Sequence, residues 1–168
     1  MLYYRPSTWG PLTIDGEHVP IPGEVIAHFR DVKRICALCE SPRVEVIGAH
    51  MRDRSSYHQN VLQTIRQREA EIKSIVFLDP DTGLQPSGKA DFEHVTNAEA
   101  AAIWAALRPG DMFVLYQHQT NRNGSPWIEP KRQQLATALG VPEAFVKIAS
   151  GPLIANDVVL FFVNADRA

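Results

Sequence analysis

The chain has 168 residues, of which 45% are hydrophobic and 21% are charged, so we expect one globular domain over residues 1–168 with a sizeable core. Its 17 basic and 19 acidic residues leave a formal net charge of −2, and no global field indicates a nucleic acid or a membrane as partner. The longest apolar run, VVLFFV, is far shorter than the roughly 18 residues that span a bilayer, and the first residues lack the order of a signal peptide. We therefore expect a cytoplasmic protein with no membrane segment.

The first fifty residues show few regular patterns. Apolar residues at helical spacing predict a helix within residues 23–40, which contains the pair Cys36 and Cys39. This pair lacks a second set of zinc ligands and lies near the predicted helix's end, so we interpret both cysteines as core residues rather than metal or redox groups. Residues 43–49 alternate as a half-buried strand does.

The remainder of the chain alternates between predicted helices and strands. We expect helices at 55–72, 96–107 and 128–139, and strands at 75–78, 111–117, 144–150 and 157–164. Such alternation is typical of α/β proteins with right-handed crossovers. The pattern predicts a three-layer, Rossmann-like, mostly parallel sheet with a C-terminal antiparallel hairpin and a shortened N-terminal half.

Two carboxylates follow the apolar strand at 75–78, in the stretch DPDTG that begins at Asp79. Turn chemistry explains Pro, Asp and Gly at such a place, because Pro fixes φ and Gly accepts a positive φ. An active site is the alternative, because ligands of open α/β sheets bind beyond the carboxyl ends of the strands. Asp79 precedes the turn at a buried strand's end and is the stronger candidate of the two, ahead of Asp81.

The element order resembles that of the class I methyltransferases, which use S-adenosylmethionine. That family places an Asp/Asn-Pro-Pro-aromatic motif after its fourth strand, and Asp79 and Pro80 match the first two positions. Asp81 and Thr82 replace the second Pro and the aromatic residue, and no glycine-rich turn precedes the motif. The resemblance implies a late antiparallel hairpin and S-adenosylmethionine as the possible cofactor. Its expected contacts are Pro80, Thr82, Gly83, Tyr116 and Gln117.

The stretch VFLDPDTGL also resembles the first motif of haloacid dehalogenase-type phosphohydrolases. There the first Asp attacks phosphorus, the second works as acid or base, and Mg²⁺ neutralises the phosphate. That family has a downstream acidic pair for the metal, and no such pair follows a later strand here. A Mg²⁺-dependent phosphohydrolase is therefore an alternative, and we predict no metal ligands.

A third resemblance joins two distant segments. VFLDPDTGL and the later GDMFVLYQHQ are similar to a group of uncharacterised bacterial and phage proteins with DPDNG and YQH patterns, over roughly residues 70–125. It implies that DPDTG and the segment Tyr116 to His118 belong together, at the shared carboxyl edge of two neighbouring strands. His118 could act there as a general base or metal ligand, or as a hydrogen-bonded structural residue.

Basic and aromatic residues follow the strand at 111–117. Arg122 and Lys131 lie on either side of Trp127 in the sequence, and such a group suits a phosphate or an unstacked base. It equally suits a solvated loop with one anchoring ring. The stretch MRDRSSYH, residues 51–58, has the same ambiguity.

We therefore expect a methyltransferase-like enzyme that acts on a nucleotide or a nucleic acid. Asp79, Asp81 and His118 are its candidate catalytic residues, and Arg122, Trp127 and Lys131 its candidate substrate-binding residues. The alternative from another class is a non-catalytic descendant of the fold that binds a nucleic acid or a protein.

Overall fold

The computed structural model describes residues 53–69, 71–119, 121, 124, 126–151 and 155–166, together with residues 12–14, 17–19, 45 and 47. The chain divides into two compact units, residues 2–50 and residues 51–168 with Met1. A single domain over the whole chain stays a prediction.

In residues 2–50 the described elements are a short hairpin. Strand β1 (Leu12–Ile14) pairs antiparallel with β2 (Glu17–Val19). The sequence between the strands is Asp-Gly, a favoured pair for a two-residue hairpin turn. The hairpin was missed from sequence because runs of three residues show no sustained periodicity, although this dipeptide was an available signal.

Other predictions for the first fifty residues fall largely outside the described residues. The predicted helix within 23–40, with its two cysteines, lies entirely outside them. Of the predicted strand 43–49 the structure describes Glu45 and Ile47, and neither belongs to a strand.

In residues 51–168 the predicted helices are confirmed. Helix α2 (Arg54–Gln67) is capped by Asp53, and α3 (Asn97–Ala106) begins with a capping box of Thr96 and Glu99. Helix α4 (Ile128–Leu139) ends at Gly140 in the left-handed conformation. The strands are β3 (Ile75–Leu78), β4 (Gly83–Leu84), β5 (His94–Val95), β6 (Met112–His118), β7 (Lys147–Gly151) and β8 (Ala155–Asn164), and a 3₁₀ helix, η3 (Glu143–Phe145), precedes β7.

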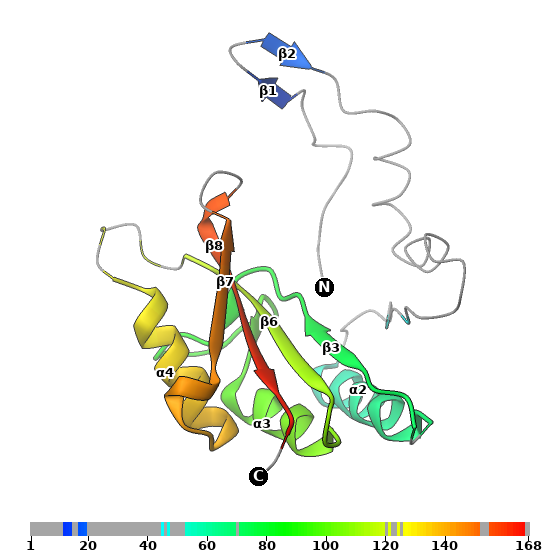
Figure 1. The fold of residues 1–168 in the computed structure, drawn as a ribbon. Coiled ribbons are helices and arrows are strands. Elements are labelled where there is room, and N and C mark those ends of the chain that lie inside the picture. Colours follow the sequence, from blue (N-terminus) through cyan, green and yellow to red (C-terminus); the bar gives the residue numbers. More distant parts are fainter. Residues whose placement is uncertain are drawn as a thin grey trace. The chain divides into compact units, whose positions relative to one another are not determined.

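Strands β3, β6, β8 and β7 form one sheet in that order (Figure 1). Strands β3 and β6 are parallel, with Leu78 opposite Leu115, whereas β8 is antiparallel to both β6 and β7. The described sheet is therefore mixed, because β8 runs opposite to β3, β6 and β7, which all run in one direction. The predicted hairpin of β7 and β8 is confirmed, with β8 between β6 and β7.

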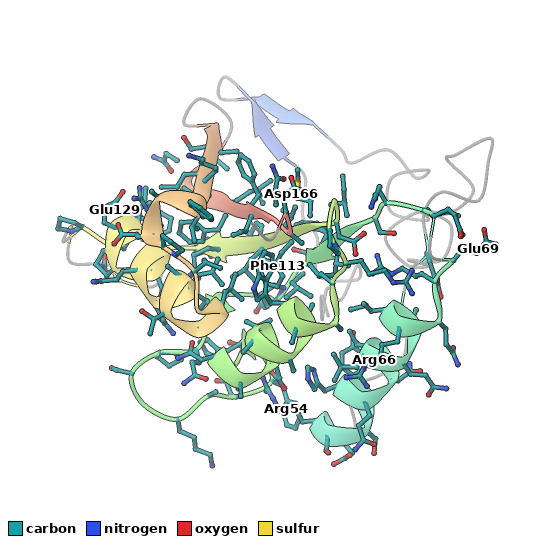
Figure 2. The ribbon with its side chains drawn as sticks, turned by 60° about the horizontal axis from the view of Figure 1, so that its bottom comes forward. Arg54, Arg66, Glu69, Phe113, Glu129 and Asp166 are labelled. Atoms are coloured by element: carbon teal, nitrogen blue, oxygen red, sulfur yellow. The ribbon has the colours of Figure 1, made fainter. Side chains whose placement is uncertain are left out.

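Helices α2, α3 and α4 lie on one face of this sheet (Figure 1). Along β6 burial alternates, so that Phe113, Leu115 and Gln117 are fully buried and the residues between them are half-buried. Phe113, labelled in Figure 2, packs against Trp104 of α3 edge to face, and the two ring centroids lie 6.5 Å apart. Each fully buried large apolar side chain contributes about 1.5–3 kcal/mol. The core of this unit therefore lies between the sheet and the three helices.

Strand β3 is less buried than its apolar run predicts. Ile75 is 68% exposed and Phe77 is 53% exposed, while Val76 and Leu78 are half-buried. A continuous apolar run is typical of strands covered on both faces. The described helices cover one face, so the predicted third layer stays a prediction.

A buried carboxylate joins the helices to the sheet just before β6. Asp111 is 1% exposed and accepts hydrogen bonds from Ser74 N (2.9 Å), Arg108 N (2.7 Å) and Arg68 Nη2 (2.9 Å). Burial opposes ionisation, but these hydrogen bonds outweigh it and hold the pKa of Asp111 below its ordinary value. Asp111 thereby fixes the starts of β3 and β6 to the ends of α2 and α3.

Candidate functional site

Between β3 and α3 the chain makes a folded excursion over residues 79–95, which begins with the DPDTG stretch. Its centre is the parallel pair of β4 and β5. Two further backbone hydrogen bonds extend this pairing, from Thr82 N to Glu93 O (3.1 Å) and from Gln85 N to Val95 O (2.8 Å). The stretch is therefore part of an ordered excursion and not an isolated turn.

The side chain of Gln117 holds the excursion against β6. Its Oε1 accepts a hydrogen bond from Leu84 N (2.8 Å), and its Nε2 donates to Thr82 O (3.0 Å) and His118 O (2.8 Å). The backbone of His118 also donates to Thr82 O, at 3.0 Å. Thr82 and its neighbours thus adjoin the end of β6, as the resemblance to the DPDNG and YQH proteins implies.

Gly83 makes this contact possible. Its φ is +116°, and a Cβ at this position would lie 2.4 Å from the carboxamide of Gln117. A side chain would therefore meet both backbone strain and a buried obstacle.

The side chain of Lys131 in α4 binds the backbone in the middle of the excursion. Its ammonium donates to Leu84 O (3.0 Å), Gln85 O (2.9 Å) and Gln134 Oε1 (3.0 Å). Burial lowers the pKa of Lys131. An ammonium has three donors. A phosphate would have to displace one of these oxygens, so the position of Lys131 favours support of the loop over the predicted contact with substrate.

Asp79 is the candidate catalytic residue that lines a pocket. It is half-buried just after β3, and burial raises its pKa, with repulsion from Asp81 adding to the rise. A carboxyl group with a raised pKa is better matched to proton exchange near neutral pH. Asp81 is exposed and does not line this pocket.

The pocket beside Asp79 has a volume of about 120 Å³ and lies between α2, the end of β3, β5 and the start of α3. We call it the Asp79 pocket. Its lining combines apolar, aromatic and titratable side chains: Tyr57, His58, Val61, Phe77, Leu78, Asp79, Pro80, Phe92, His94, Val95, Glu99 and Ile103. Burial raises the pKa of Tyr57. The basic and aromatic stretch at 51–58 was the available sequence signal for Tyr57 and His58, whereas nothing in the sequence indicated the residues from β5 and α3.

An ion pair between α2 and α3 fixes one wall of the Asp79 pocket. The guanidinium of Arg54, at the start of α2 in Figure 2, donates to both carboxylate oxygens of Glu99 at 2.6 Å. It also donates to Asp91 O (2.7 Å) and His94 O (2.6 Å). Burial opposes ionisation of Glu99, but Arg54 and the capping contacts with Thr96 hold its pKa below the ordinary value.

His118 lies at the end of β6 and faces β8. Its Nε2 is 3.0 Å from Asp157 Oδ2, and its Nδ1 is 3.0 Å from Gln119 O. Both ring nitrogens therefore face oxygen acceptors, and His118 does not line the Asp79 pocket. This geometry favours the hydrogen-bonded structural interpretation over a general base or a metal ligand.

The five residues expected around a cofactor do not form a binding surface together. Pro80, Gly83 and Gln117 are buried, and the carboxamide of Gln117 is occupied by the excursion. Thr82 and Tyr116 are half-buried. Gly83 and the side chain of Gln117 thus support the loop, whereas Pro80 lines the Asp79 pocket, so the five residues do not form the expected cofactor contacts as one group.

Of the other two candidate substrate-binding residues the structure describes one, Trp127. Trp127 is half-buried at the N-cap of α4 and does not line the Asp79 pocket. Arg122 lies outside the described residues.

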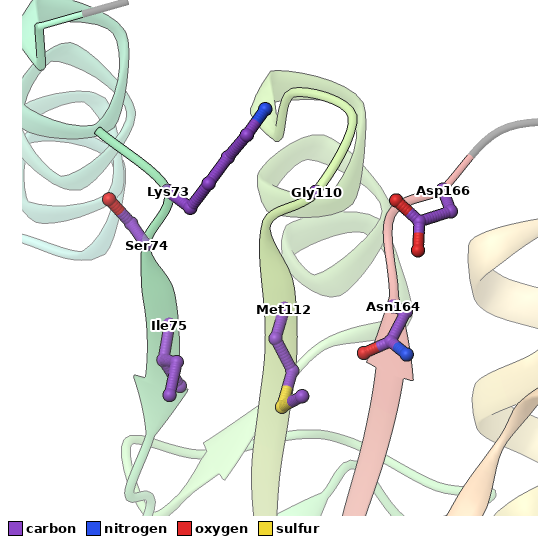
Figure 3. Close-up of a pocket in the computed structure, with 7 residues that line it drawn as sticks. All are labelled: Lys73, Ser74, Ile75, Gly110, Met112, Asn164 and Asp166. Carbon is purple, nitrogen blue, oxygen red and sulfur yellow. The ribbon is translucent and has the colours of Figure 1, made fainter. Parts of the chain in front are cut away.

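A second hollow, of about 290 Å³, lies at the opposite end of β3 and β6 (Figure 3). It is lined by Lys73, Ser74, Ile75, Gly110, Met112, Asn164 and Asp166. In Figure 3 Lys73 extends towards the loop of Gly110, where its Nζ donates to Pro109 O at 2.5 Å. Because ligands of α/β sheets bind at the carboxyl ends of parallel strands, the Asp79 pocket is the better candidate.

Within the described ranges no three His, Cys, Asp or Glu residues are grouped so that they could hold a metal ion. None of the helices in the described part of the chain is long and apolar enough to cross a membrane.

Neither a family model, nor a curated protein, nor a solved structure significantly matches the chain.

Proposed function

We propose that the chain is an enzyme of methyltransferase-like fold that carries out transfer chemistry on a nucleotide or a nucleic acid. The observation that supports this most directly is Asp79, a half-buried carboxyl group with a raised pKa in a pocket at the end of a parallel strand. A perturbed pKa in a cleft is a common property of catalytic groups. The carboxyl end of a parallel strand is also where such sheets bind ligands.

The finer fold assignment is a three-layer, Rossmann-like domain with a shortened N-terminal half. The described strand order supports it, because β8 enters antiparallel between β6 and β7, which are parallel to each other. The sheets of class I methyltransferases likewise close with a late antiparallel hairpin. Helices α2, α3 and α4 would form one outer layer of that architecture. Fold analogy alone does not imply the reaction, so the proposal depends on the Asp79 pocket.

Asp79 would accept the proton that a substrate amine or hydroxyl group loses when a new bond forms on its nitrogen or oxygen. General acid or base catalysis of this kind contributes about 10²–10⁴-fold to a rate. The aromatic side chains in the pocket suit contact with an unstacked base.

Calorimetric titration of the full-length protein with S-adenosylmethionine and with adenosine 5′-monophosphate tests the proposal. We expect binding of at least one of them, weakened by Asp79→Asn and unchanged by Asp166→Asn, an exposed carboxylate at the opposite end of the sheet. No heat with either compound at millimolar concentration would contradict the enzyme and favour a non-catalytic descendant of the fold.

A further inference from the structure

We propose that His94 determines the specificity of the Asp79 pocket, because Asp91 holds its ring in the tautomer that accepts a hydrogen bond from the substrate. The group that His94 selects is an N–H donor on the edge of an unstacked base. The inference rests on the proposed function, whose pocket it uses. It adds a residue that recognises the substrate and leaves the proton transfer to Asp79.

Asp91 and His94 form a hydrogen-bonded pair in the turn that leads into β5. Asp91 Oδ1 lies 2.5 Å from His94 Nδ1 and also accepts from Glu93 N, at 3.1 Å. The hydrogen bond to His94 is the largest of the causes that lower the pKa of Asp91, so the carboxylate is ionised. An ionised carboxylate only accepts hydrogen bonds, and the proton between the two groups therefore belongs to Nδ1. In the neutral ring the other nitrogen, Nε2, is then an acceptor.

The guanidinium of Arg54 holds the backbone of both members of this pair. It donates to Asp91 O at 2.7 Å and to His94 O at 2.6 Å. The same guanidinium is bound by both carboxylate oxygens of Glu99, which ties it to α3. The ring of His94 is thus held through its backbone and through Nδ1, as recognition by a single hydrogen bond requires.

The second ring nitrogen of His94 is left for a ligand. His94 lines the Asp79 pocket, and its side chain is 12% exposed. Asp91 is exposed and does not line the pocket, so it binds Nδ1 without filling the cavity. Within the described residues the hydrogen bond of the ring is made by Nδ1. A largely buried acceptor gains more from a donor on a ligand than an exposed acceptor does.

The remainder of the lining suits a flat base. Tyr57, Phe77 and Phe92 line the pocket, and the rings of Phe77 and Phe92 belong to side chains that are more than half exposed. Stacking on aromatic rings favours every base and does not discriminate among them. A volume of about 120 Å³ is below the roughly 300–1,000 Å³ of drug-sized sites, so the pocket admits a base or its edge and leaves the sugar outside.

Discrimination among bases then has to come from hydrogen bonds to the edge of the base. A site that is built to bind an N–H group rejects the analogue that lacks it, because the polar atom of the site is left unpaired. A histidine ring that is free to change its tautomer either donates or accepts, and does not select in this way. The pairing with Asp91 therefore gives His94 its specificity.

Adenosine and purine riboside separate this contact from stacking. Purine riboside carries hydrogen in place of the amino group of adenosine, and neither compound has a phosphate. Binding of each to the full-length protein is measured by NMR titration, with no cofactor present. We expect adenosine to bind about fivefold more tightly, which is the net gain from roughly one hydrogen bond. Equal binding, or no binding of adenosine at millimolar concentration, would overturn the inference.

Three variants assign the preference to the pair. His94→Phe keeps a flat ring and removes the acceptor, so it should abolish the preference for adenosine. Asp91→Ala leaves the lining of the pocket intact and frees the tautomer, so it should reduce the preference. Asp157→Ala is the matched control, because Asp157 pairs with His118 outside the pocket, and it should have no effect. A preference that survives His94→Phe, or that falls as much in Asp157→Ala as in Asp91→Ala, would contradict the assignment.

The tautomer of His94 is measured without any ligand. Long-range proton–nitrogen NMR spectra of the ¹⁵N-labelled full-length protein are recorded at about pH 9, where imidazole rings are neutral. The proton of His94 should lie on Nδ1 in the wild type and should be shared between the two nitrogens in Asp91→Ala. A proton on Nε2 in the wild type would refute the inference. This measurement needs neither S-adenosylmethionine nor turnover, so its failure is distinguishable from a failure of the proposed function.

Discussion

The backbone of Gly83 lies so close to the side chain of Gln117 that a Cβ on Gly83 would stand 2.4 Å from the carboxamide. Gln117 in turn hydrogen-bonds the backbone on both sides of Gly83, at Thr82 O and Leu84 N. Gly83 and Gln117 together thus determine the backbone path of the DPDTG stretch after β3. The position of Asp79, four residues before Gly83, depends on that path.

Gly83→Ala should therefore be strongly destabilising. The positive φ and the contact with a fully buried side chain add their costs, and we expect a loss of about 3 kcal/mol or more in the free energy of unfolding. Urea denaturation measures it. Gly88→Ala is the matched control in the same excursion, because a Cβ there has nothing within 4 Å. Similar losses for the two variants would contradict the account.

Gln117→Ala should cost about 2–4 kcal/mol, because it leaves Leu84 N without its acceptor and opens a cavity. The same change removes the obstacle to a side chain at position 83. In a double-mutant cycle the cost of Gly83→Ala should thus be smaller in the Gln117→Ala background, by about 1 kcal/mol or more. Additive costs would show that the two residues act independently.

The regular elements of the second half could be predicted because each has a local signal. A capping box at Thr96 begins α3, and Gly140 in the left-handed conformation ends α4. The apolar runs located β3 and β6, and their adjacency followed from the crossover through α3. Strands β4 and β5 have two residues each, too few for a periodic pattern.

The candidate site was only partly predictable. Asp79 stood out because a carboxylate at the end of an apolar strand needs an explanation. The hydrogen bonds of Gln117 to the excursion could not be foreseen, since these two partners are backbone atoms 33 and 35 residues earlier in the chain. The side chains of α2 and β5 that line the Asp79 pocket come together only through tertiary packing. The pairing of His118 with Asp157 depends on the position of β8 in the sheet.

Asp79→Asn should change the pH dependence of stability in a defined direction. Because burial and Asp81 raise the pKa of Asp79, the folded protein holds this proton more tightly than the unfolded chain does. The contribution of Asp79 to stability is then full below the unfolded value of about 3.9 and is lost as pH rises through the folded pKa. Over that pH range the stability of the variant should therefore rise relative to that of the wild type. Urea denaturation between acid and neutral pH measures the difference, and a constant difference would refute the assignment.

Asp111→Asn should show the opposite trend. The lowered pKa of Asp111 means that its stabilisation is present above about pH 3.9 and is lost as pH falls through the folded value. At neutral pH we expect a loss of about 3 kcal/mol, because Arg68 would lose its carboxylate partner in a nearly buried site. The difference in the free energy of unfolding between the variant and the wild type should become smaller at acid pH. Denaturation curves at several pH values test this, and a gap that widens in acid would be inconsistent with the hydrogen bonds described.

Magnesium should have no effect on thermal stability. The described residues contain no group of three or more His, Cys, Asp or Glu side chains that could hold a metal ion, and Asp81 is exposed and does not line the Asp79 pocket. We expect the same melting temperature with and without millimolar Mg²⁺, in the wild type and in Asp79→Asn, by differential scanning calorimetry. A rise in the wild type that the variant lacks would favour the phosphohydrolase alternative.

Turnover by the wild type, Asp79→Asn and Asp166→Asn tests the central claim that chemistry takes place beside Asp79. Transfer of label from radioactive S-adenosylmethionine to a mixture of nucleotides and nucleic acids is measured for each full-length protein, with circular dichroism as the check on folding. We predict transfer by the wild type and by Asp166→Asn, and a loss of about 10²-fold or more in a correctly folded Asp79→Asn protein. Wild-type rates in Asp79→Asn, or no transfer by the wild type, would contradict the claim.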